Sequence, residues 1–310
     1  MPIIDPHHHI WTAAHGKYDY MMPELLADVR AGHNIVKTVY CECRQSYRPD
    51  GPSELRPVGE TEFVIDAVSR GREDRTGLCE GLVMHADLML GAAVAAVLDA
   101  HVAVAGSRLK GIRQIVAHDP SPQVRSFVPR AGLLSEPAFR EGVRTLARHG
   151  LVFETFVFHG QLAELAALAD ACPDAAIVVD ALGGPLGVGP YKDRRDEVFP
   201  QWRRDIAALA ERPNVLIHIG GFGAKMFGFG FHKADRPATE DFAAAWRPYL
   251  ESCLAAFGAE RCMLTSNFPE DGSSISYRQL WNVFKYLCRD FPAHEKARLF
   301  SETSKATYHL

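Results

Sequence analysis

Residues 151–158 read LVFETFVF, and HGQLAELAALADACP follows them directly. The first stretch is a short apolar run rich in Phe and Val, which is typical of a strand buried on both faces of a parallel sheet. The second stretch places apolar residues at helical spacing, so it predicts a helix that packs against this strand. The pair forms a strand–helix unit, and the same alternation continues along the rest of the chain.

Eight apolar runs of this kind occur, and helical stretches separate them. Eight strands, each followed by a helix, in a chain of 310 residues predict an α/β fold, a single (β/α)8 barrel over residues 1–310. The alternative is an open doubly wound sheet, but no glycine-rich phosphate motif follows the first strand. The predicted strands are residues 2–5, 35–43, 79–85, 109–115, 151–158, 176–180, 215–219 and 262–266.

The composition is that of an ordinary globular protein, with 47% hydrophobic and 23% charged residues. A net charge of −4 argues against nucleic acid as the main partner, because binding it requires a basic face. We find no uninterrupted apolar run long enough for a membrane span and no signal peptide. The seven cysteines include no CxxC pair, which favours reduced thiols and a cytoplasmic location.

Four long irregular segments each follow a predicted strand: residues 44–56, 116–134, 182–197 and 220–238. In a barrel such loops lie at the C-terminal face, where active sites are built. Residues 220–231, GGFGAKMFGFGF, predict a flexible apolar loop over the mouth of the barrel.

Two histidines stand just beyond the first predicted strand, in DPHHHIW. In an extended segment residues i and i+2 point the same way, so His7 and His9 would both face the barrel mouth while His8 points outward. Two converging imidazoles suit a metal ion or an acid–base pair. The alternative is a histidine-rich terminus without a role.

Further polar residues lie where the second and third strands end. Tyr40, Glu42 and Arg44 alternate along the second strand, and His85 ends the third. We predict that they contact the substrate. For Glu42 and Arg44 a solvated ion pair is the open alternative.

The fourth predicted strand, LKGIRQI, carries Lys110 and Arg113. An arginine inside a barrel strand is energetically unfavourable unless it is paired, so we predict that Arg113 binds a substrate carboxylate, with Lys110 nearby. The alternative is a buried salt bridge between Arg113 and Glu42 or Glu154.

The last four strands add five more candidates. Glu154 and His159 bracket the end of the fifth strand, His218 lies in the seventh, and Asn267 and Asp271 follow the eighth. A helix-cap or loop role is open for these residues. We nevertheless predict a ring of polar groups around one face, with His159, His218, Asn267 and Asp271 in catalysis and Glu154 in substrate binding.

The stretches IDPHHHIW, LKGIRQI, FHGQLAEL, ALGGPLG and SNFPED, in this order, resemble the amidohydrolase-2 branch of the amidohydrolase superfamily. That branch includes lactonases for pyrone dicarboxylate, sulfomuconolactone and sugar lactones, together with some decarboxylases. The resemblance covers nearly the whole chain and implies a barrel that hydrolyses a small ester, lactone or amide. It places His7 and His9 at the HxH pair of the first strand.

Two positions depart from that family. Ala181 stands where the family has a histidine at strand six, and Asn267 stands where it has the aspartate of strand eight. Alanine can neither bind a metal nor polarise a substrate, and asparagine has no basic site near neutral pH. Since zinc usually takes at least three protein ligands and only His7 and His9 match, a metal-free site is favoured over one zinc or manganese ion.

Three functions remain open. The first is a hydrolase with a rearranged site, acting on a small lactone, ester or amide with an anionic group, in which Asp271, Glu154 or a histidine activates water. The second is a metal-free lyase or isomerase, similar to a decarboxylase, acting on an unsaturated carboxylic acid or lactone. The third is an inactive or engineered member that binds ligand. We expect a small carboxylate or lactone as partner, no nucleic acid and no membrane, and we leave a homodimer open.

Overall fold

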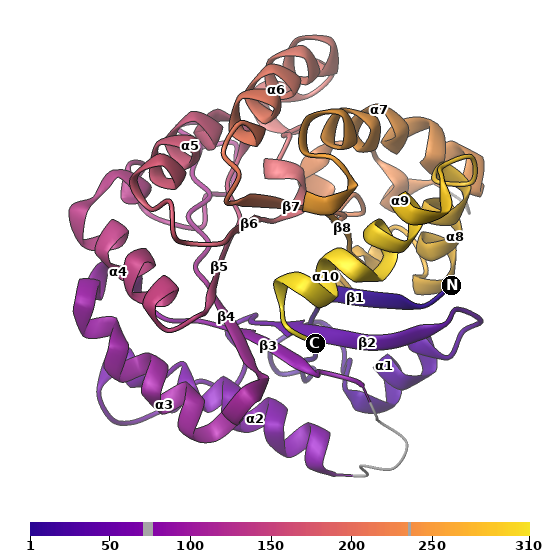
Figure 1. Ribbon diagram of the computed structural model, residues 1–310. Helices are drawn as coiled ribbons and strands as arrows, with labels where there is room; N and C mark the ends of the chain where they lie inside the picture. Colours follow the sequence, from indigo (N-terminus) through magenta and orange to yellow (C-terminus); the bar gives the residue numbers. More distant parts are fainter. Residues whose placement is uncertain (71–76, 235–236) are drawn as a thin grey trace.

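The computed structural model describes residues 1–70, 77–234 and 237–310. At its centre lies one eight-stranded sheet whose strands follow each other in chain order and pair in parallel. Helices surround the sheet (Figure 1), which confirms the predicted (β/α)8 barrel. The strands are β1 (Ile3–His8), β2 (Ile35–Cys41), β3 (Gly81–Met84), β4 (Leu109–Arg113), β5 (Val152–Thr155), β6 (Ile177–Val179), β7 (Val215–Ile219) and β8 (Cys262–Leu264).

The barrel closes where β1 meets the segment that follows β8. The backbone N–H of His9 donates to the carbonyl of Phe268 at 2.7 Å, and the N–H of Asn267 donates to the carbonyl of His7 at 2.9 Å. Because of this pairing, β1 continues three residues beyond its predicted end. His7 therefore lies within a strand and not in a loop, as its spacing from Asp5 allows.

One or more helices follow each strand, and three of them carry tryptophans that are fully buried, Trp202, Trp246 and Trp281. These side chains therefore belong to the core between helices and sheet. The helices are α1 (Met22–Val29), α2 (Val58–Ser69), α3 (Ala95–Ala105), α4 (Pro137–Arg148), α5 (Leu162–Ala171), α6 (Arg195–Ala210), α7 (Thr239–Phe257), α8 (Tyr277–Leu287), α9 (Ala293–Ala297) and α10 (Thr303–Thr307).

The interior of the barrel has two layers. On three neighbouring strands an apolar residue is followed two positions later by an ionisable one, and residues two apart point the same way. The apolar members pack together with residues of the C-terminal segment, whereas the ionisable members form a polar layer nearer the C-terminal ends of the strands. The pairs are Val152 and Glu154, Val178 and Asp180, and Leu216 and His218.

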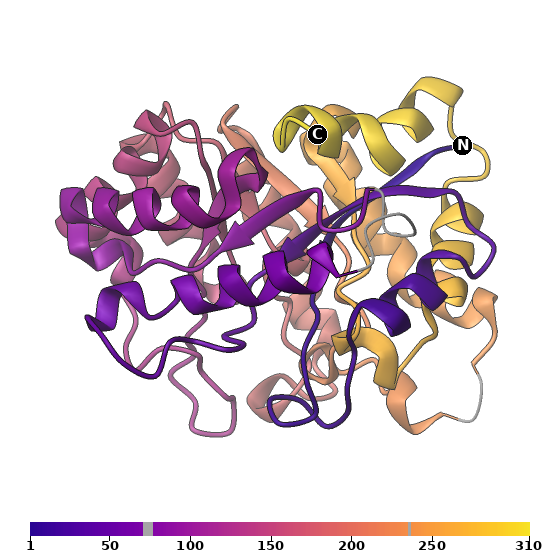
Figure 2. The same ribbon diagram turned by 90° about the horizontal axis from the view of Figure 1, so that it is seen from below.

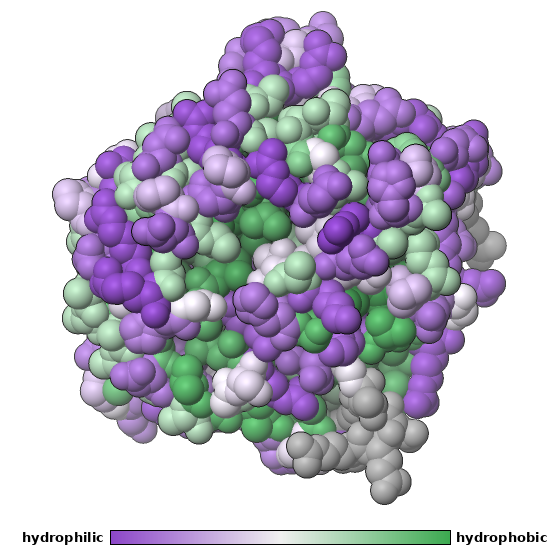
Figure 3. Space-filling view, in the orientation of Figure 1, coloured by the Kyte–Doolittle hydropathy of each residue, from purple (hydrophilic) through white to green (hydrophobic). Residues whose placement is uncertain are grey.

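The C-terminal segment covers the N-terminal end of this interior. In Figure 1, α9 and α10 cross in front of the strands, and α10 contacts β1 and β8. Tyr308, just after α10, is fully buried among the apolar interior residues. Figure 3 shows this face, which is hydrophilic over the outer helices and hydrophobic towards its centre.

The segment Leu88–Arg108 is long and apolar enough to span a membrane, judged by length and composition alone, although Asp99 and His101 interrupt its apolar run. Its helix is interrupted at Gly91, and it forms part of the outer ring between α2 and α4. The buried His101 within it bonds to the Thr61 hydroxyl at 2.7 Å and to the His85 carbonyl at 3.0 Å. These contacts are those of a helix packed on a barrel.

The long loops that follow β2, β4, β6 and β7 lie on the side of the molecule away from the chain termini (Figure 2). The loop of residues 220–238 includes aromatic side chains that pack into the structure. Residues 235–236 of this loop lie outside the described residues. Phe222 stacks on Trp246 with ring centroids 4.7 Å apart, and Phe227 is buried. These contacts anchor the aromatic residues of the segment, and its flexibility stays a prediction. The cysteines form no disulfide bond within the described residues.

Candidate active site

A cavity of about 480 Å³ opens among the C-terminal strand ends and the loops that follow them. Its polar part comes from strand ends, its apolar wall comes mainly from loop residues, and exposed charged residues line its outer part. The polar part includes His7, His9, Glu42, Arg113, Asp180, Thr265 and Asn267; the wall includes Ile115, Phe127, Phe156, Met226 and Phe227; the exposed residues are His15, Arg44, Arg125 and Glu270.

His9 borders the cavity with its tautomer fixed. Its Nδ1 lies 2.7 Å from the backbone carbonyl of Cys41. A carbonyl only accepts hydrogen bonds, so Nδ1 carries the hydrogen and Nε2 keeps its lone pair. Burial, with the charges of His7 and Arg113, lowers the pKa of His9 well below its usual value. His9 is therefore a neutral imidazole with a free basic nitrogen.

His7 stands beside His9, with ring centroids 5.1 Å apart and the rings perpendicular. Its Nδ1 lies 3.0 Å from Glu154 Oε1 and 3.5 Å from Asp180 Oδ1, while its buried Nε2 has no partner among the described residues. Burial alone would lower the pKa of His7, but Asp180 and Glu154 outweigh it and raise the pKa to about 9. The pKa is therefore raised for one histidine of the HxH pair, His7, and lowered for the other, His9.

Arg113 is held by the protein itself. Its Nε donates to Asp180 Oδ2 at 2.7 Å, and its Nη1 donates to the Glu42 backbone carbonyl at 3.0 Å and lies 3.6 Å from the Glu42 carboxylate. Burial would raise the pKa of Asp180, but Arg113 and His7 lower it well below its usual value. The alternative of a buried salt bridge is therefore correct for Glu42, and Asp180 takes the place proposed for Glu154.

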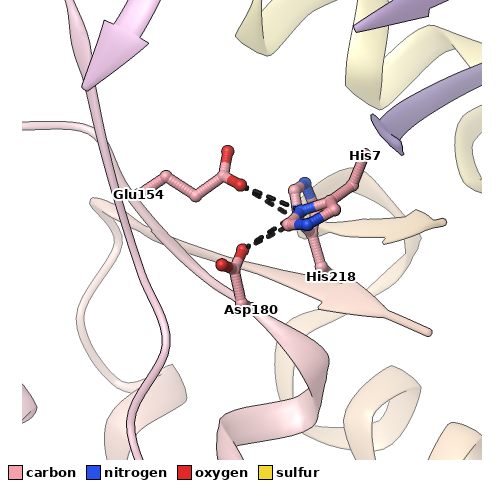
Figure 4. A group of neighbouring side chains, drawn as sticks. All are labelled: His7, Glu154, Asp180 and His218. Atoms are coloured by element: carbon pink, nitrogen blue, oxygen red, sulfur yellow. Dashed lines mark hydrogen bonds and ion pairs between the residues drawn. The ribbon is translucent and has the colours of Figure 1, made fainter. Parts of the chain in front are cut away.

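Glu154 and His218 lie one layer deeper, since they contact His7 and Asp180 but do not line the cavity. His218 Nδ1 is 3.2 Å from Asp180 Oδ1, and Tyr308 Oη lies 3.0 Å from His218 Nε2 and 2.8 Å from Glu154 Oε2. Figure 4 shows His7, Glu154, Asp180 and His218 pointing toward one another.

Asn267 lines the cavity, whereas Asp271 is fully buried behind it. Asp271 accepts hydrogen bonds from Asn267 Nδ2 at 2.8 Å and from the backbone N–H of Gly223 at 2.8 Å. Burial raises the pKa of Asp271 to about 7, against these two hydrogen bonds. Asp271 positions Asn267 and does not reach the cavity, so it is not placed to activate water there.

Two predicted substrate-binding residues do not line the cavity. Tyr40 is buried outside the barrel interior, where its hydroxyl donates to Glu60 Oε1 at 2.8 Å. Lys110 lies near the N-terminal start of β4, and its Nζ donates to the backbone carbonyl of His309 at 3.1 Å. The placement of Tyr40 follows from the alternation of side chains along a strand, which sends every second residue away from the interior. Lys110 instead lies beside Gly81 at the end of the barrel opposite the cavity.

Two predicted histidines also lie outside the cavity lining. His85 Nδ1 lies 3.0 Å from the backbone carbonyl of Arg113, and the ring stacks beside Tyr47. His159 begins a short 3₁₀ helix, and its Nδ1 accepts from the N–H of Leu186 at 3.4 Å. The open alternative, a loop-stabilising role, therefore matches the position of His159. His159 therefore does not take the role of the strand-six histidine of the family, whose position is occupied by Ala181.

The sequence reasoning missed Asp180, Tyr308 and the aromatic wall. Asp180 directly follows β6 in AIVVD, so the strand-end rule that selected Glu154 could have found it. Tyr308 reaches the interior from the C-terminal segment, which no local pattern connects with the strands. The wall residues come from three separate loops, and their convergence depends on the fold.

A metal site formed by the HxH pair is not supported, because Ala181 and Asn267 stand at the positions of its usual partners. A different set does fit a divalent cation. One donor atom each from His7, Glu154, Asp180 and His218 lies within 4.8 Å of the other three. Two imidazoles and two carboxylates make a donor set of the kind that zinc uses.

The barrel and its cavity of strand-end histidines define an enzyme of the amidohydrolase class. Residues 4–310 match the amidohydrolase family, and the chain belongs to that family. It is 29% identical over 328 aligned positions to the uncharacterised protein y4mH of Sinorhizobium fredii (strain NBRC 101917 / NGR234), covering 99% of this chain and 98% of that protein.

Solved structures of similar fold include hydrolases and decarboxylases. A zinc-bound amidohydrolase from Burkholderia multivorans matches with a TM-score of 0.76 and 21% identity over 100% of both chains. A Pseudomonas putida structure assigned as a 2-pyrone-4,6-dicarboxylic acid hydrolase has a TM-score of 0.65 and 19% identity over 99% of this chain and 97% of that chain. A manganese-bound dihydroxybenzoic acid decarboxylase from Polaromonas sp. JS666 has a TM-score of 0.64 and 13% identity over 100% and 97%. At these identities the likeness shows the fold.

Proposed function

We propose that the protein hydrolyses a small lactone, or a related ester or amide, that carries an anionic group. The observation that carries this proposal is the fixed tautomer of His9, which keeps a lone pair on Nε2. Its ring centroid is 5.1 Å from that of His7, whose Nε2 has no partner among the described residues. A base beside a hydrogen-bond donor is the pair that water attack on a carbonyl needs.

In the proposed reaction a water molecule attacks the carbonyl carbon while His9 Nε2 takes one of its protons. His7, with its Nδ1 hydrogen-bonded to carboxylates, donates from Nε2 to the carbonyl oxygen as charge develops there. The ring C–O bond then breaks, and the proton on His9 passes to the leaving oxygen. Lactone and water give one hydroxy acid.

Substrate binding is assigned to the apolar wall and the exposed arginines. Phe127, Phe156 and Phe227 offer a surface for a small ring, and Arg44 and Arg125 offer charge for its anionic group. Arg113 serves mainly as an anchor for Asp180 and Glu42, since two of its nitrogens are already engaged. This assignment changes the role first predicted for Arg113.

A divalent cation fits His7, Glu154, Asp180 and His218, and when bound it would supply positive charge close to the cavity. The reaction steps described above use only side chains of the protein and water.

The test is a proton-release assay on carboxylated five- and six-membered lactones, including 2-pyrone-4,6-dicarboxylate. His9→Gln should lower kcat by about 10²–10⁴, the usual contribution of a general base. His159→Gln is the matched control, because His159 is buried outside the cavity lining, and it should keep wild-type activity. Equal activity of His9→Gln and wild type would remove His9 from the mechanism.

The competing proposal is a lyase or decarboxylase, in which the same two histidines move a proton on an unsaturated acid. Fold similarity to decarboxylases is its support. Release of CO₂ from 2,6-dihydroxybenzoate without release of acid from any lactone would favour it. Ligand binding without turnover of either class would favour a binding protein.

For the cellular setting we propose a cytoplasmic enzyme that acts on a small molecule, with neither nucleic acid nor membrane as partner. Its net charge of −4 and its cysteines without disulfides support this. The homodimer remains a prediction, and light scattering of the purified protein would test it.

A further inference from the structure

We propose that His7, Glu154, Asp180 and His218 bind one divalent cation of the zinc type beside the catalytic cavity. These four residues lie on or directly after β1, β5, β6 and β7, and their side chains converge (Figure 4). His9 is not a member, so this centre differs from one built on the HxH pair. The inference goes beyond the proposed hydrolysis and does not depend on it.

The separations of the four donor atoms fit a set of metal ligands as well as a set of hydrogen-bond partners. The N···O distances are 3.0 and 3.5 Å from His7 Nδ1, and 3.2 and 3.9 Å from His218 Nδ1, to the same two carboxylate oxygens. Hydrogen bonds between nitrogen and oxygen are most often about 2.9–3.0 Å long. Zinc–ligand bonds of about 2.0–2.1 Å in a tetrahedron put neighbouring ligand atoms about 3.3 Å apart.

The hydrogen bonds of Tyr308 direct the lone pair of His218 toward the centre of the group. The single hydroxyl hydrogen goes to the Glu154 carboxylate, which can only accept. His218 Nε2 must then donate to the tyrosine oxygen, so Nε2 carries a hydrogen and Nδ1 is the ring nitrogen left to bind a cation. Nδ1 lies 3.2 Å from Asp180 Oδ1, and a cation between these atoms would be bound by both. Such outer partners are typical of metal-binding histidines.

The charges of the buried groups call for further positive charge. Three carboxylates, Glu42, Glu154 and Asp180, are buried around a single guanidinium, that of Arg113. Asp180 keeps Oδ1 for the group because Arg113 takes Oδ2. A divalent cation bound to His7 Nδ1 would take the place of the His7 proton, and it would then balance the two negative charges that Arg113 leaves at the point where the four donors meet.

The ligand set is closed, since the protein supplies four ligands from strands far apart in sequence. Closed sites of this kind contribute to folding, whereas catalytic zinc sites keep a position open for water. His7 and Asp180 line the cavity, which gives the ion a route of entry. The cation would therefore link β1, β5, β6 and β7 and stabilise the barrel.

The test is metal content and thermal stability of the full chain. Protein purified without chelators, or stripped and reloaded with Zn²⁺, should hold about one equivalent per chain by plasma mass spectrometry. Reloading should also raise the melting temperature above that of the chelator-treated protein, because an ion that binds only the folded state stabilises it. Neither measurement depends on turnover, so failure of the hydrolysis proposal would leave both results intact.

Three variants test which residues bind the ion. His218→Gln should lose the equivalent, and Tyr308→Phe should weaken Zn²⁺ binding by about 10–100-fold, as loss of an outer partner does. His9→Gln is the matched control and should keep the ion. Loss of zinc from His9→Gln as complete as from His218→Gln would overturn the proposal, and so would reloaded wild-type protein with neither bound zinc nor a shifted melting temperature. If His218→Gln does not fold, the wild-type and Tyr308→Phe measurements still decide.

Discussion

Arg113 shows how a residue that the sequence predicts to bind substrate can be used by the protein itself. Its guanidinium lies between Asp180 and Glu42, two carboxylates that are almost fully buried. Removing the guanidinium would leave Glu42 without its ion-pair partner, and Asp180 with only His7 and His218. The desolvation penalty of an unpaired buried charge is larger than the loss of a surface contact.

Arg113→Ala should therefore lower the free energy of unfolding by about 3–5 kcal/mol, measured by urea denaturation. Arg44→Ala is the matched control at the exposed edge of the cavity. It should change stability by less than about 0.5 kcal/mol, while it raises KM for an anionic substrate. An Arg113→Ala protein as stable as wild type, with only KM raised, would restore the carboxylate-binding role.

Asp271 should give the protein a specific dependence of stability on pH. Burial raises the pKa of this carboxyl to about 7 in the folded protein, while it is about 4 in an unfolded chain. Between these values the unfolded state releases the proton and the folded state keeps it, so stability falls as pH rises from about 4 to about 7. Above that range the loss, roughly 4 kcal/mol, stays constant.

Asp271→Asn removes this contribution. The unfolding free energy of wild type relative to the variant should decline between pH 4.5 and pH 7.5, measured by urea titration at both values. Glu240→Gln, an exposed glutamate in the first turn of α7, should follow the wild-type pH dependence. A difference between wild type and Asp271→Asn that is the same at both pH values would contradict the raised pKa.

At the scale of elements, α4 and the segment Leu88–Val94 pack so closely that one glycine is required. A Cβ on Gly142, within α4, would lie 2.9 Å from Leu88 Cα and closer still to the Leu88 carbonyl oxygen. Alanine is a better helix former than glycine by about 1 kcal/mol. At this position the backbone contact outweighs that preference.

Gly142→Ala should therefore destabilise the protein by about 1–3 kcal/mol, the usual effect of overpacking. Gly160→Ala is the control, because no atom lies within 4 Å of its added Cβ. Thermal unfolding of both variants checks the prediction. A stabilised Gly142→Ala protein would show that α4 does not pack on this segment as described.

The elements themselves were predictable, because buried parallel strands and amphipathic helices differ in length and periodicity. All eight strands were predicted, and the bounds of β7 are the same as those predicted. The end of β1 was not, since its last residues owe their extended form to pairing with the segment after β8. Local sequence does not contain that contact.

The site was predictable in part. Strand-end position identified His7, His9, Glu42, Arg113 and Asn267 as cavity residues. It could not tell that Tyr40 faces away from the barrel interior or that Lys110 lies at the end of the barrel opposite the cavity, so neither residue lines the cavity as predicted. Alternation fixes the assignment only once the register between strands is known.

At the scale of the whole molecule, the barrel has a different use at each end. The C-terminal segment and apolar residues fill the N-terminal part of the interior, a buried layer of charged and ionisable groups lies above them, and the cavity opens beyond that layer. This order of layers keeps the charged residues away from solvent, and it places the two histidines where they could contact a substrate. The proposed hydrolysis requires that water attacks the substrate carbonyl at the wall of this cavity.

The most direct measurement is the mass of the product formed in ¹⁸O-labelled water. A carboxylated lactone, with 2-pyrone-4,6-dicarboxylate as one probe, is incubated with the enzyme, and the product is analysed by mass spectrometry. Hydrolysis predicts a hydroxy acid, or its keto form, that carries one oxygen from the solvent in its new carboxylate, and far less of it with His9→Gln. A product without solvent oxygen, or with CO₂ as the only fragment released, would contradict the account.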